Sequence, residues 1–401
     1  MKRILFRVVL LLLAGGLFGC RKETPATMDP NDTSCSTWLD VFDSFWEGMN
    51  YSYAFWDIDP TDWDEVYRTY RPRFAELGEW NGEHLEEARL MLEEITANLI
   101  DHHYSLALFD PETGEVACTI RPALNELRQR DYYHDPMPTQ QFYDIISSYG
   151  ATGRVTRLIG GTSAAPISQP LMMVSFLIDD VAYLYFDRFI LSELFLVADE
   201  TDNAIRAWRN FWDMIETTPN LRGILIDVRD NQGGYLSDMR ELAGRLTAEE
   251  HLFGYSRTKS GLGRLDYTPW LPLTLTPTTP GYSAAGDLPV VLLTSLYSIS
   301  MAELTAMAIH SLPNGHLIGE RTYGGTGYIY SNFHIAYAGR FQNEALLVYM
   351  TSSMSRDAEG TCLEGIGITP DREALFDAEQ FAAGTDTQLE AALDYIRSLE
   401  Q

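Results

Sequence analysis

The sequence predicts an α/β protein in which a helical N-terminal segment precedes a core with parallel strands. Between residues 36 and 100, apolar residues recur at spacings of three and four, which is typical of amphipathic helices. From about residue 172, short apolar runs alternate with helix-like segments, and this alternation favours parallel pairing through crossover helices. The chain has 401 residues, 45% of them hydrophobic, which is enough for one large core with an attached subdomain.

The first twenty residues have the layout of an export signal. A basic start, MKRILFR, is followed by the apolar run VVLLLLAGGLF, which is too short to be a permanent membrane span. The segment LFGC (17–20) then resembles a bacterial lipobox, which implies cleavage before Cys20 and lipidation of that cysteine. An ordinary secretory signal is the alternative. We therefore expect a signal peptide at 1–19, a polar tether at 20–35, and a lipid-anchored protein of the cell envelope, at the outer membrane or periplasmic face.

The composition excludes some partners and cofactors. The formal net charge is −28, and a surface this acidic repels phosphate backbones, so we expect no nucleic-acid partner. The cysteine spacing matches no zinc pattern, and we assign no metal. Export would allow a disulfide between two of Cys35, Cys118 and Cys362, but the sequence does not select the pair. The oligomeric state is not indicated by the sequence.

Residues 36–105 are predicted to form the helical subdomain. Its segments STWLDVFDSFWEGMNYSYAFW, TDWDEVYRTYRPRFAEL and NGEHLEEARLMLEEITANLI carry the helical period, with Thr61 and Asn81 as expected N-caps. The stretch DHHYSLALFD (101–110) then begins to alternate, which predicts a strand. Residues 106–175 combine turn residues with one helix-like run, TQQFYDIISSYG, and form an insert or connecting region whose role the sequence does not reveal.

Two strands of the predicted core end in groups that could carry chemistry. The run ILIDVRDNQGG ends in Gly233 and Gly234, whose backbone can approach a substrate closely. The run PVVLLTSLYSIS leads to Ser300 at the start of the next predicted helix. Reactive groups collect at the carboxyl ends of parallel strands, so these two ends together predict an active site.

Ser300 allows two interpretations. Ser300 and Glu303 form the S-x-x-E pattern of a capping box, which would make Ser300 a helix cap. A nucleophile would also benefit from this place, because helix N–H groups and the helix dipole stabilise developing negative charge. Ser298 is available as the cap, and we therefore expect the two roles to coexist in this turn.

Four motifs carry a resemblance to a known family. In order they are ILIDVRDNQGG, VVLLTSLYSISMAELTAMAI, HLIGERTYGGTG and LEGIGITPD, and the series resembles the S41 peptidases, the C-terminal-processing and tricorn-core serine proteases. The helical segment is similar to the lead-in of the tricorn and retinoid-binding-protein branch. The resemblance implies a ClpP/crotonase-like α/β core at 176–401 with a C-terminal helix, Ser300 as nucleophile, no cofactor, and peptides or unstructured protein segments as substrates.

The resemblance also indicates a general base. The C-terminal-processing branch uses a lysine, but Gly325 stands at that position in GERTYGGTG. The tricorn-like branch uses histidine and glutamate, which implies His103 as base and Glu364 as its orienting partner, with Glu359 as the other candidate. That branch has a serine before the histidine, where this chain has His102. Either His102 replaces the serine, or water does, or activity is impaired.

The oxyanion hole follows from the same resemblance. It implies backbone N–H donors from Gly233 or Gly234 and from Met301. Asp227 and Arg229 flank the glycine pair, either as a structural ion pair or in a catalytic role. The sequence therefore predicts an exported, lipid-anchored serine endopeptidase. The alternative is a catalytically inactive S41-like binding lipoprotein on the same scaffold.

Overall fold

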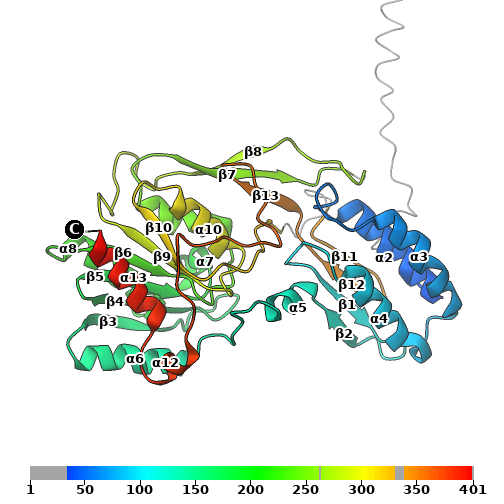
Figure 1. Ribbon diagram of the computed structural model, residues 1–401, viewed down its shortest axis with the longest axis horizontal. Coiled ribbons are helices and arrows are strands. Elements are labelled where there is room, and N and C mark those ends of the chain that lie inside the picture. The colour runs from blue at the N-terminus through cyan, green and yellow to red at the C-terminus, as the bar shows by residue number, and fades with distance from the viewer. Residues whose placement is uncertain (1–33, 262, 330–337, 400–401) are drawn as a thin grey trace, which may run out of the picture.

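The computed structural model describes residues 34–399, apart from residue 262 and residues 330–337. The predicted signal peptide and the lipidation site Cys20 lie outside the described residues. Within them, no helix is both long and apolar enough to cross a bilayer. Figure 1 shows two lobes: a smaller one that contains the N-terminal helices, and a larger α/β lobe.

The smaller lobe packs helices on an antiparallel sheet. Its helices are α2 (Trp38–Ser52), α3 (Trp63–Glu76), the short η2 (Gly82–His84) and α4 (Leu85–Thr96). Its sheet has the order β11 (Arg340–Gln342), β12 (Leu346–Tyr349), β1 (Ser105–Phe109) and β2 (Val116–Ile120). Strands from the last quarter of the chain therefore complete the N-terminal lobe.

The predicted helix starts in this lobe are right in one case and wrong in the other. Asn81 caps η2 by accepting a hydrogen bond from the Glu83 N–H. The cap of α3 is Asp62 rather than Thr61, because the Asp62 carboxylate accepts from the Glu65 N–H. An aspartate at this position also places negative charge at the positive end of the helix dipole.

The larger lobe is built on a seven-stranded sheet. The order is β14 (Arg372–Glu373), β10 (Gly315–Gly319), β9 (Val290–Thr294), β6 (Gly223–Asp227), β5 (Val181–Phe186), β4 (Met172–Ile178) and β3 (Val155–Thr162). Pairing is parallel from β14 to β5 and antiparallel from β5 to β3. Strands β6 and β9 are buried along their whole length, which explains their continuous apolar runs. The predicted α/β class is confirmed.

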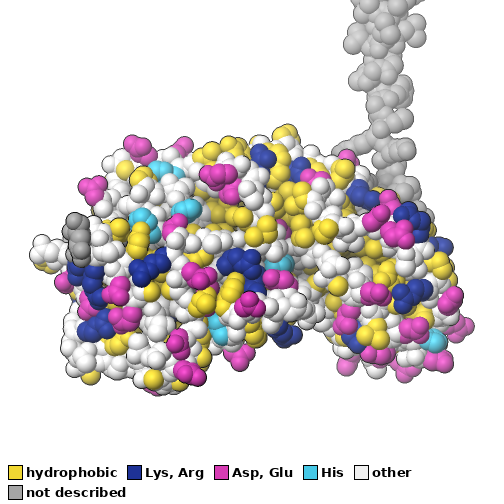
Figure 2. Space-filling model, viewed as in Figure 1, with side chains coloured by type: hydrophobic (Ala, Val, Ile, Leu, Met, Phe, Trp, Pro, Cys, Tyr) yellow, Lys and Arg dark blue, Asp and Glu magenta, His cyan; other side chains and the backbone are white. Residues whose placement is uncertain are grey.

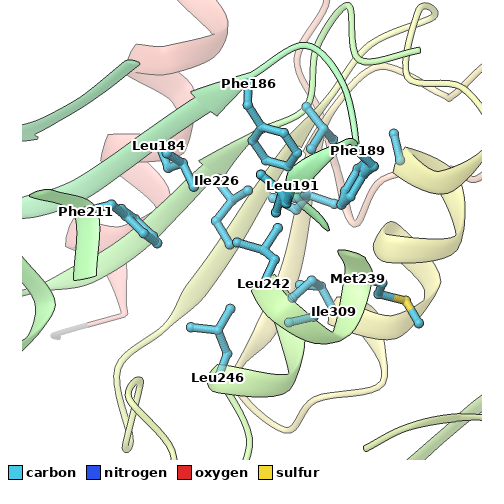
Figure 3. Close-up of a cluster of buried hydrophobic side chains, with 14 of the residues drawn as sticks. Leu184, Phe186, Phe189, Leu191, Phe211, Ile226, Met239, Leu242, Leu246 and Ile309 are labelled. Atoms are coloured by element: carbon cyan, nitrogen blue, oxygen red, sulfur yellow. The ribbon is translucent and has the colours of Figure 1, made fainter. Parts of the chain in front are cut away.

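Helices cover both faces of this sheet. One face carries α7 (Leu191–Val197), α8 (Asn203–Thr217), α9 (Leu236–Leu242), η3 (Ala243–Arg245) and α10 (Met301–His310). The other carries α6 (Thr139–Ala151), α12 (Ala378–Ala382) and α13 (Thr387–Ser398). Figure 3 shows the first face, where Ile226 of the sheet lies close to Leu242 of α9.

A third sheet and one short helix connect the lobes. The sheet has the order β13 (Ser353–Asp357), β7 (His251–Thr258) and β8 (Leu271–Leu275), and in Figure 1 it runs along the top toward the N-terminal helices. Arg264, between β7 and β8, forms an ion pair with Asp64 of α3 at 2.6 Å. Helix α5 (Pro122–Arg128) lies between the lobes. The lobes are thus held together, and residues from both can form one site.

Candidate active site

Ser300 occupies a strained turn between β9 and α10. It is the N-cap of α10, with φ = 60° and ψ = −112°. A positive φ is unfavourable for a residue with a side chain, and such strain often marks a functional site. Reciprocal bonds hold this conformation: the Ser300 N–H donates to the Glu303 carboxylate at 3.0 Å, and the Glu303 N–H donates to the Ser300 carbonyl at 2.9 Å. The turn fixes Ser300 at the positive end of the helix dipole.

The expectation that Ser298 caps this helix is wrong. Ser298 is fully buried, and its hydroxyl accepts a hydrogen bond from the Ser295 N–H and donates one to the Val228 carbonyl, at 3.0 and 2.8 Å. These bonds connect the turn after β9 to the loop after β6. Ser298 therefore stabilises the turn through these two hydrogen bonds, while Ser300 itself occupies the cap position.

Glu303 does more than the capping-box pattern indicated. Its buried carboxylate also accepts hydrogen bonds from the Thr322 hydroxyl at 2.6 Å and from the N–H groups of Gly324 and Gly325, each at 2.7 Å. Burial raises the pKa of this carboxyl group. One carboxylate thus joins the nucleophile turn to the loop after β10.

His103 and Ser300 line the same cavity, which has a volume of about 560 Å³. Both ring nitrogens of His103 are buried and have no hydrogen-bond partner in the part of the chain that the structure describes. Burial, with the neighbouring His102, lowers the pKa of His103 to about 4. The ring is therefore neutral near pH 7, as a general base must be. A direct Ser300–His103 hydrogen bond is not formed among the described residues, and such contacts often tighten only with substrate.

Glu364 lies beside His103. Its Oε1 is 4.0 Å from His103 Nδ1 and accepts a hydrogen bond from the His102 N–H at 3.0 Å. Its Oε2 accepts from the N–H groups of Thr326 and Gly327 at 2.7 and 2.8 Å. Burial raises the pKa of Glu364 well above its ordinary value, and nearby Asp101 and Glu303 act in the same direction. The structure brings Glu364 to the histidine, whereas Glu359 is exposed in a turn.

Asp101 fixes the backbone of His103 through a hydrogen bond. Its Oδ1 accepts a hydrogen bond from the His103 N–H at 2.9 Å, and its Oδ2 accepts from the N–H and hydroxyl of Thr351 at 2.8 and 3.0 Å. Burial raises the pKa of Asp101 to about 6. Because Thr351 follows β12, this residue ties the histidine loop to the C-terminal part of the chain.

Asp101, His103 and Glu364 also resemble a metal-binding cluster. One ligand atom from each lies within 4.8 Å of the others. Each of the four carboxylate oxygens, however, already accepts at least one hydrogen bond from the protein. We therefore assign these carboxylates to positioning the histidine loop, and not to a metal.

His102 does not replace the serine of the tricorn-like branch through its ring. His102 Nδ1 lies 2.8 Å from the Tyr323 carbonyl, and the two rings meet edge to face at 5.3 Å. Its backbone N–H, and not its side chain, contacts Glu364. The His102 ring is thus bonded to Tyr323, and of the two histidines only His103 lines the cavity.

The glycine pair after β6 packs against the nucleophile. A Cβ on Gly233 would lie 2.7 Å from Ser300 Cβ and 2.8 Å from the Met301 nitrogen, so only glycine fits there. The Gly233 N–H already donates to Asn231 Oδ1 at 2.8 Å. Within the described residues, the N–H groups of Gly234 and Met301 donate no hydrogen bond. Of the predicted oxyanion-hole donors, the N–H groups of Gly234 and Met301 are therefore the two available to bind a substrate oxygen.

Asp227 and Arg229 form a structural network away from the cavity. Both are buried, and Arg229 Nη2 lies 2.6 Å from Asp227 and 2.8 Å from Asp386, the N-cap of α13. The Tyr183 hydroxyl also donates to Asp227, at 2.5 Å. These contacts join β6, β5 and the C-terminal helix, as the structural interpretation of the pair expects.

Fold and site together define a class: an α/β protein with a strained serine at a helix N-terminus beside a neutral histidine. In comparison with known proteins, residues 180–374 are similar to the sequence model of peptidase family S41. A crystal structure of a candidate peptidase from Parabacteroides merdae shares the fold, with a TM-score of 0.64 and 24% identity over 90% of this chain and 97% of that one.

Two curated relatives are proteases by name. Tricorn protease homolog 1 of Streptomyces coelicolor is 27% identical over 173 residues, which are 43% of this chain and 14% of that protein. The carboxyl-terminal-processing protease of Synechocystis sp. is 26% identical over 177 residues, 43% of this chain and 36% of that protein. The aligned segments therefore span well under half of the length of either relative, 14% of one and 36% of the other.

Proposed function

We propose that this protein is a serine endopeptidase that cleaves peptides or unstructured protein segments. The observation that carries the proposal is that strained Ser300 and neutral His103 line one cavity. The S41 match over residues 180–374 supports the same reaction class.

The proposed mechanism uses groups that line this one cavity. His103 takes the proton from the Ser300 hydroxyl as the serine oxygen attacks the peptide carbonyl. Nδ1 faces Glu364, so Nε2 is the nitrogen that receives the proton. The N–H groups of Gly234 and Met301 stabilise the oxyanion. The imidazolium then returns the proton to the leaving amine, and water hydrolyses the acyl-enzyme by the same sequence of proton transfers.

Glu364 becomes more acidic during this cycle. In the resting site its burial favours the protonated acid. When His103 becomes an imidazolium 4.0 Å away, the positive charge favours the carboxylate, and the carboxylate in turn stabilises the imidazolium. Glu364 can therefore act as the orienting partner although it is buried among other carboxyl groups.

A fluorophosphonate probe tests the nucleophile. The wild-type protein is expected to be labelled, Ser300→Ala to lose labelling, and Ser311→Ala, at the other end of α10, to retain it. Labelling that survives Ser300→Ala would remove Ser300 from the mechanism. A folded wild-type protein that is never labelled would favour the alternative, an inactive binding protein on the same scaffold.

We further propose that the protein is anchored in the cell envelope through a lipid on Cys20. The support is the lipobox-like LFGC segment. Cys20→Ala should move the protein from the membrane fraction to the soluble fraction, while Cys118→Ala should leave it in the membrane fraction. A Cys20→Ala protein that still carries a radiolabelled fatty acid would contradict the proposal.

A further inference from the structure

The cavity beside Ser300 contains a single fixed charge. Among the described residues that line it, Arg188 is the only one of the types Asp, Glu, Lys and Arg. His103 adds no charge near neutral pH, because its pKa is lowered to about 4. The whole chain carries a net charge of −28, and acidic side chains are prominent on the surface in Figure 2. The cavity is thus locally positive on an acidic protein.

The Arg188 guanidinium forms no salt bridge within the described residues, although its charge opposes the burial that raises the pKa of the adjacent Asp187. Its Nη1 donates to the neutral amide oxygen of Gln232 at 3.0 Å. Its Nε is a buried donor with no acceptor in the part of the chain that the structure describes. The adjacent Asp187 accepts instead from the Met172 N–H at 2.9 Å. Buried donors are rarely left unpaired, so an arginine with this environment calls for an explanation.

The carboxylate of Glu193, which lies near the cavity, already accepts hydrogen bonds from other residues. Glu193 accepts hydrogen bonds from the Tyr235 hydroxyl and from the N–H and hydroxyl of Ser168. Ser168 and Tyr235 line the cavity, so Glu193 holds its wall in place without pairing with Arg188.

The loop that carries Arg188 is fixed to the nucleophile. The Gln232 N–H donates to the Asp187 carbonyl at 3.1 Å, and the Phe189 N–H donates to the Gly233 carbonyl at 2.8 Å. Gly233 in turn packs against Ser300. Arg188 is therefore held by the same turn that supports the reacting oxygen, and it can position a group on the substrate.

We propose that Arg188 binds a carboxylate of the substrate, so that the protein prefers acidic peptides. This inference rests on the proposed peptidase function. The planar guanidinium is suited to a carboxylate, with which it can form two parallel hydrogen bonds. Ile190, Leu236 and Leu304 supply an apolar wall in the same cavity, which accommodates the remainder of the chain. The carboxylate is either an Asp or Glu side chain near the cleaved bond or the free C-terminus of the peptide.

The test compares matched peptides on wild type, Arg188→Met, Arg188→Glu and the control Arg209→Met, whose arginine pairs with Glu200 on the surface of α8. The peptides carry Glu, Gln or Lys at each position near the cleaved bond, each with a free or an amidated C-terminus. Wild type and the control should cleave a carboxylate-bearing peptide about tenfold or more faster in kcat/KM than its neutral counterpart. Arg188→Met should remove that preference, and Arg188→Glu should favour the Lys peptide.

The peptide arms distinguish the two sources of the carboxylate. If the Glu peptide is cleaved faster than the Gln peptide, Arg188 binds a side-chain carboxylate. If the peptide with a free C-terminus is cleaved faster than the amidated one, Arg188 binds the C-terminal carboxylate. Equal cleavage of all peptides by wild type would overturn the role of Arg188 and leave the peptidase intact. If no peptide is cleaved, binding of the same peptides to Ser300→Ala is measured instead. Binding of acidic peptides that depends on Arg188 would retain the role of Arg188 without the peptidase function. No binding of any peptide would overturn both proposals.

Discussion

The imidazole of His103 occupies the space that a side chain at position 325 would need. A Cβ built on Gly325 would lie 2.9 Å from His103 Cε1 and 3.1 Å from Nδ1. In the GERTYGGTG motif, this position corresponds to the lysine base of the C-terminal-processing branch. A side chain at position 325 and the His103 ring in its present place therefore exclude each other sterically.

Gly325→Ala should displace the His103 ring and slow the reaction. The added methyl group is closer than van der Waals contact allows, so the His103 ring must shift to admit it. We expect the rate of fluorophosphonate labelling to fall about tenfold to a hundredfold, because small misplacements of a base are costly. Gly150→Ala is the control, since Gly150 lies in α6 without a positive φ and the nearest atom to a Cβ there is 3.9 Å away. Unchanged labelling by Gly325→Ala would show that His103 is not the base.

Glu303→Gln should damage the nucleophile turn. The carboxylate accepts from the N–H groups of Ser300, Gly324 and Gly325, and an amide nitrogen in its place would face donors instead. We expect a loss of about 1–3 kcal/mol in the free energy of unfolding for each donor left without an acceptor. We also expect the labelling rate to fall by more than the folded fraction does. Glu241→Gln, on the partly exposed face of α9, should change neither quantity.

The features that could be predicted from the sequence are those that depend on residues close together in the chain. The runs that became β6 and β9 were recognisable because buried parallel strands are continuously apolar, and Ser300 lies directly after one of them. The pairing of β12 with β1 was not recognisable, because its register joins residues such as Leu106 and Val348 that are far apart in the chain.

The same distinction applies to the site. The motifs indicated the glycine pair, but they did not indicate that the Asn231 side chain accepts a hydrogen bond from the Gly233 N–H. The sequence did not indicate Arg188, since an arginine after a strand is ordinary until the structure shows a buried Nε that has no acceptor among the described residues. The second half of the S-x-x-E pattern pointed to Glu303, but its bonds to the loop after β10 depend on tertiary contacts.

Arg229→Met should test the structural network without touching the cavity. The substitution leaves Asp227 and Asp386 buried without their cation, and breaking a buried pair in this way costs about 3–5 kcal/mol. Urea unfolding should show that loss, while the folded fraction at low temperature should still be labelled at the wild-type rate. Arg209→Met should unfold like wild type. A large fall in labelling by folded Arg229→Met would return the pair to a catalytic role.

The pH dependence of activity should reveal the buried histidine. Because the pKa of His103 is lowered to about 4, the neutral base persists well below the ordinary value of about 6.5. We expect kcat/KM to stay level from pH 8 to about pH 5 and to fall as pH approaches about 4, by tenfold per unit once the imidazolium predominates. A fall already centred near pH 6.5 would mean that the base is a solvated histidine.

Stability over the same range provides the control for this profile. His103 binds fewer protons folded than unfolded between about pH 4 and 6.5, so its contribution to stability is lost as pH falls through that window. Asp101, with a pKa raised to about 6, binds more protons folded than unfolded, so its contribution increases as pH falls. The two effects oppose each other, and thermal melting should show a wild-type protein that remains folded at pH 5. His103→Gln removes only the first effect, so its melting temperature relative to wild type should rise between pH 7 and pH 5; a relative fall would contradict the lowered pKa.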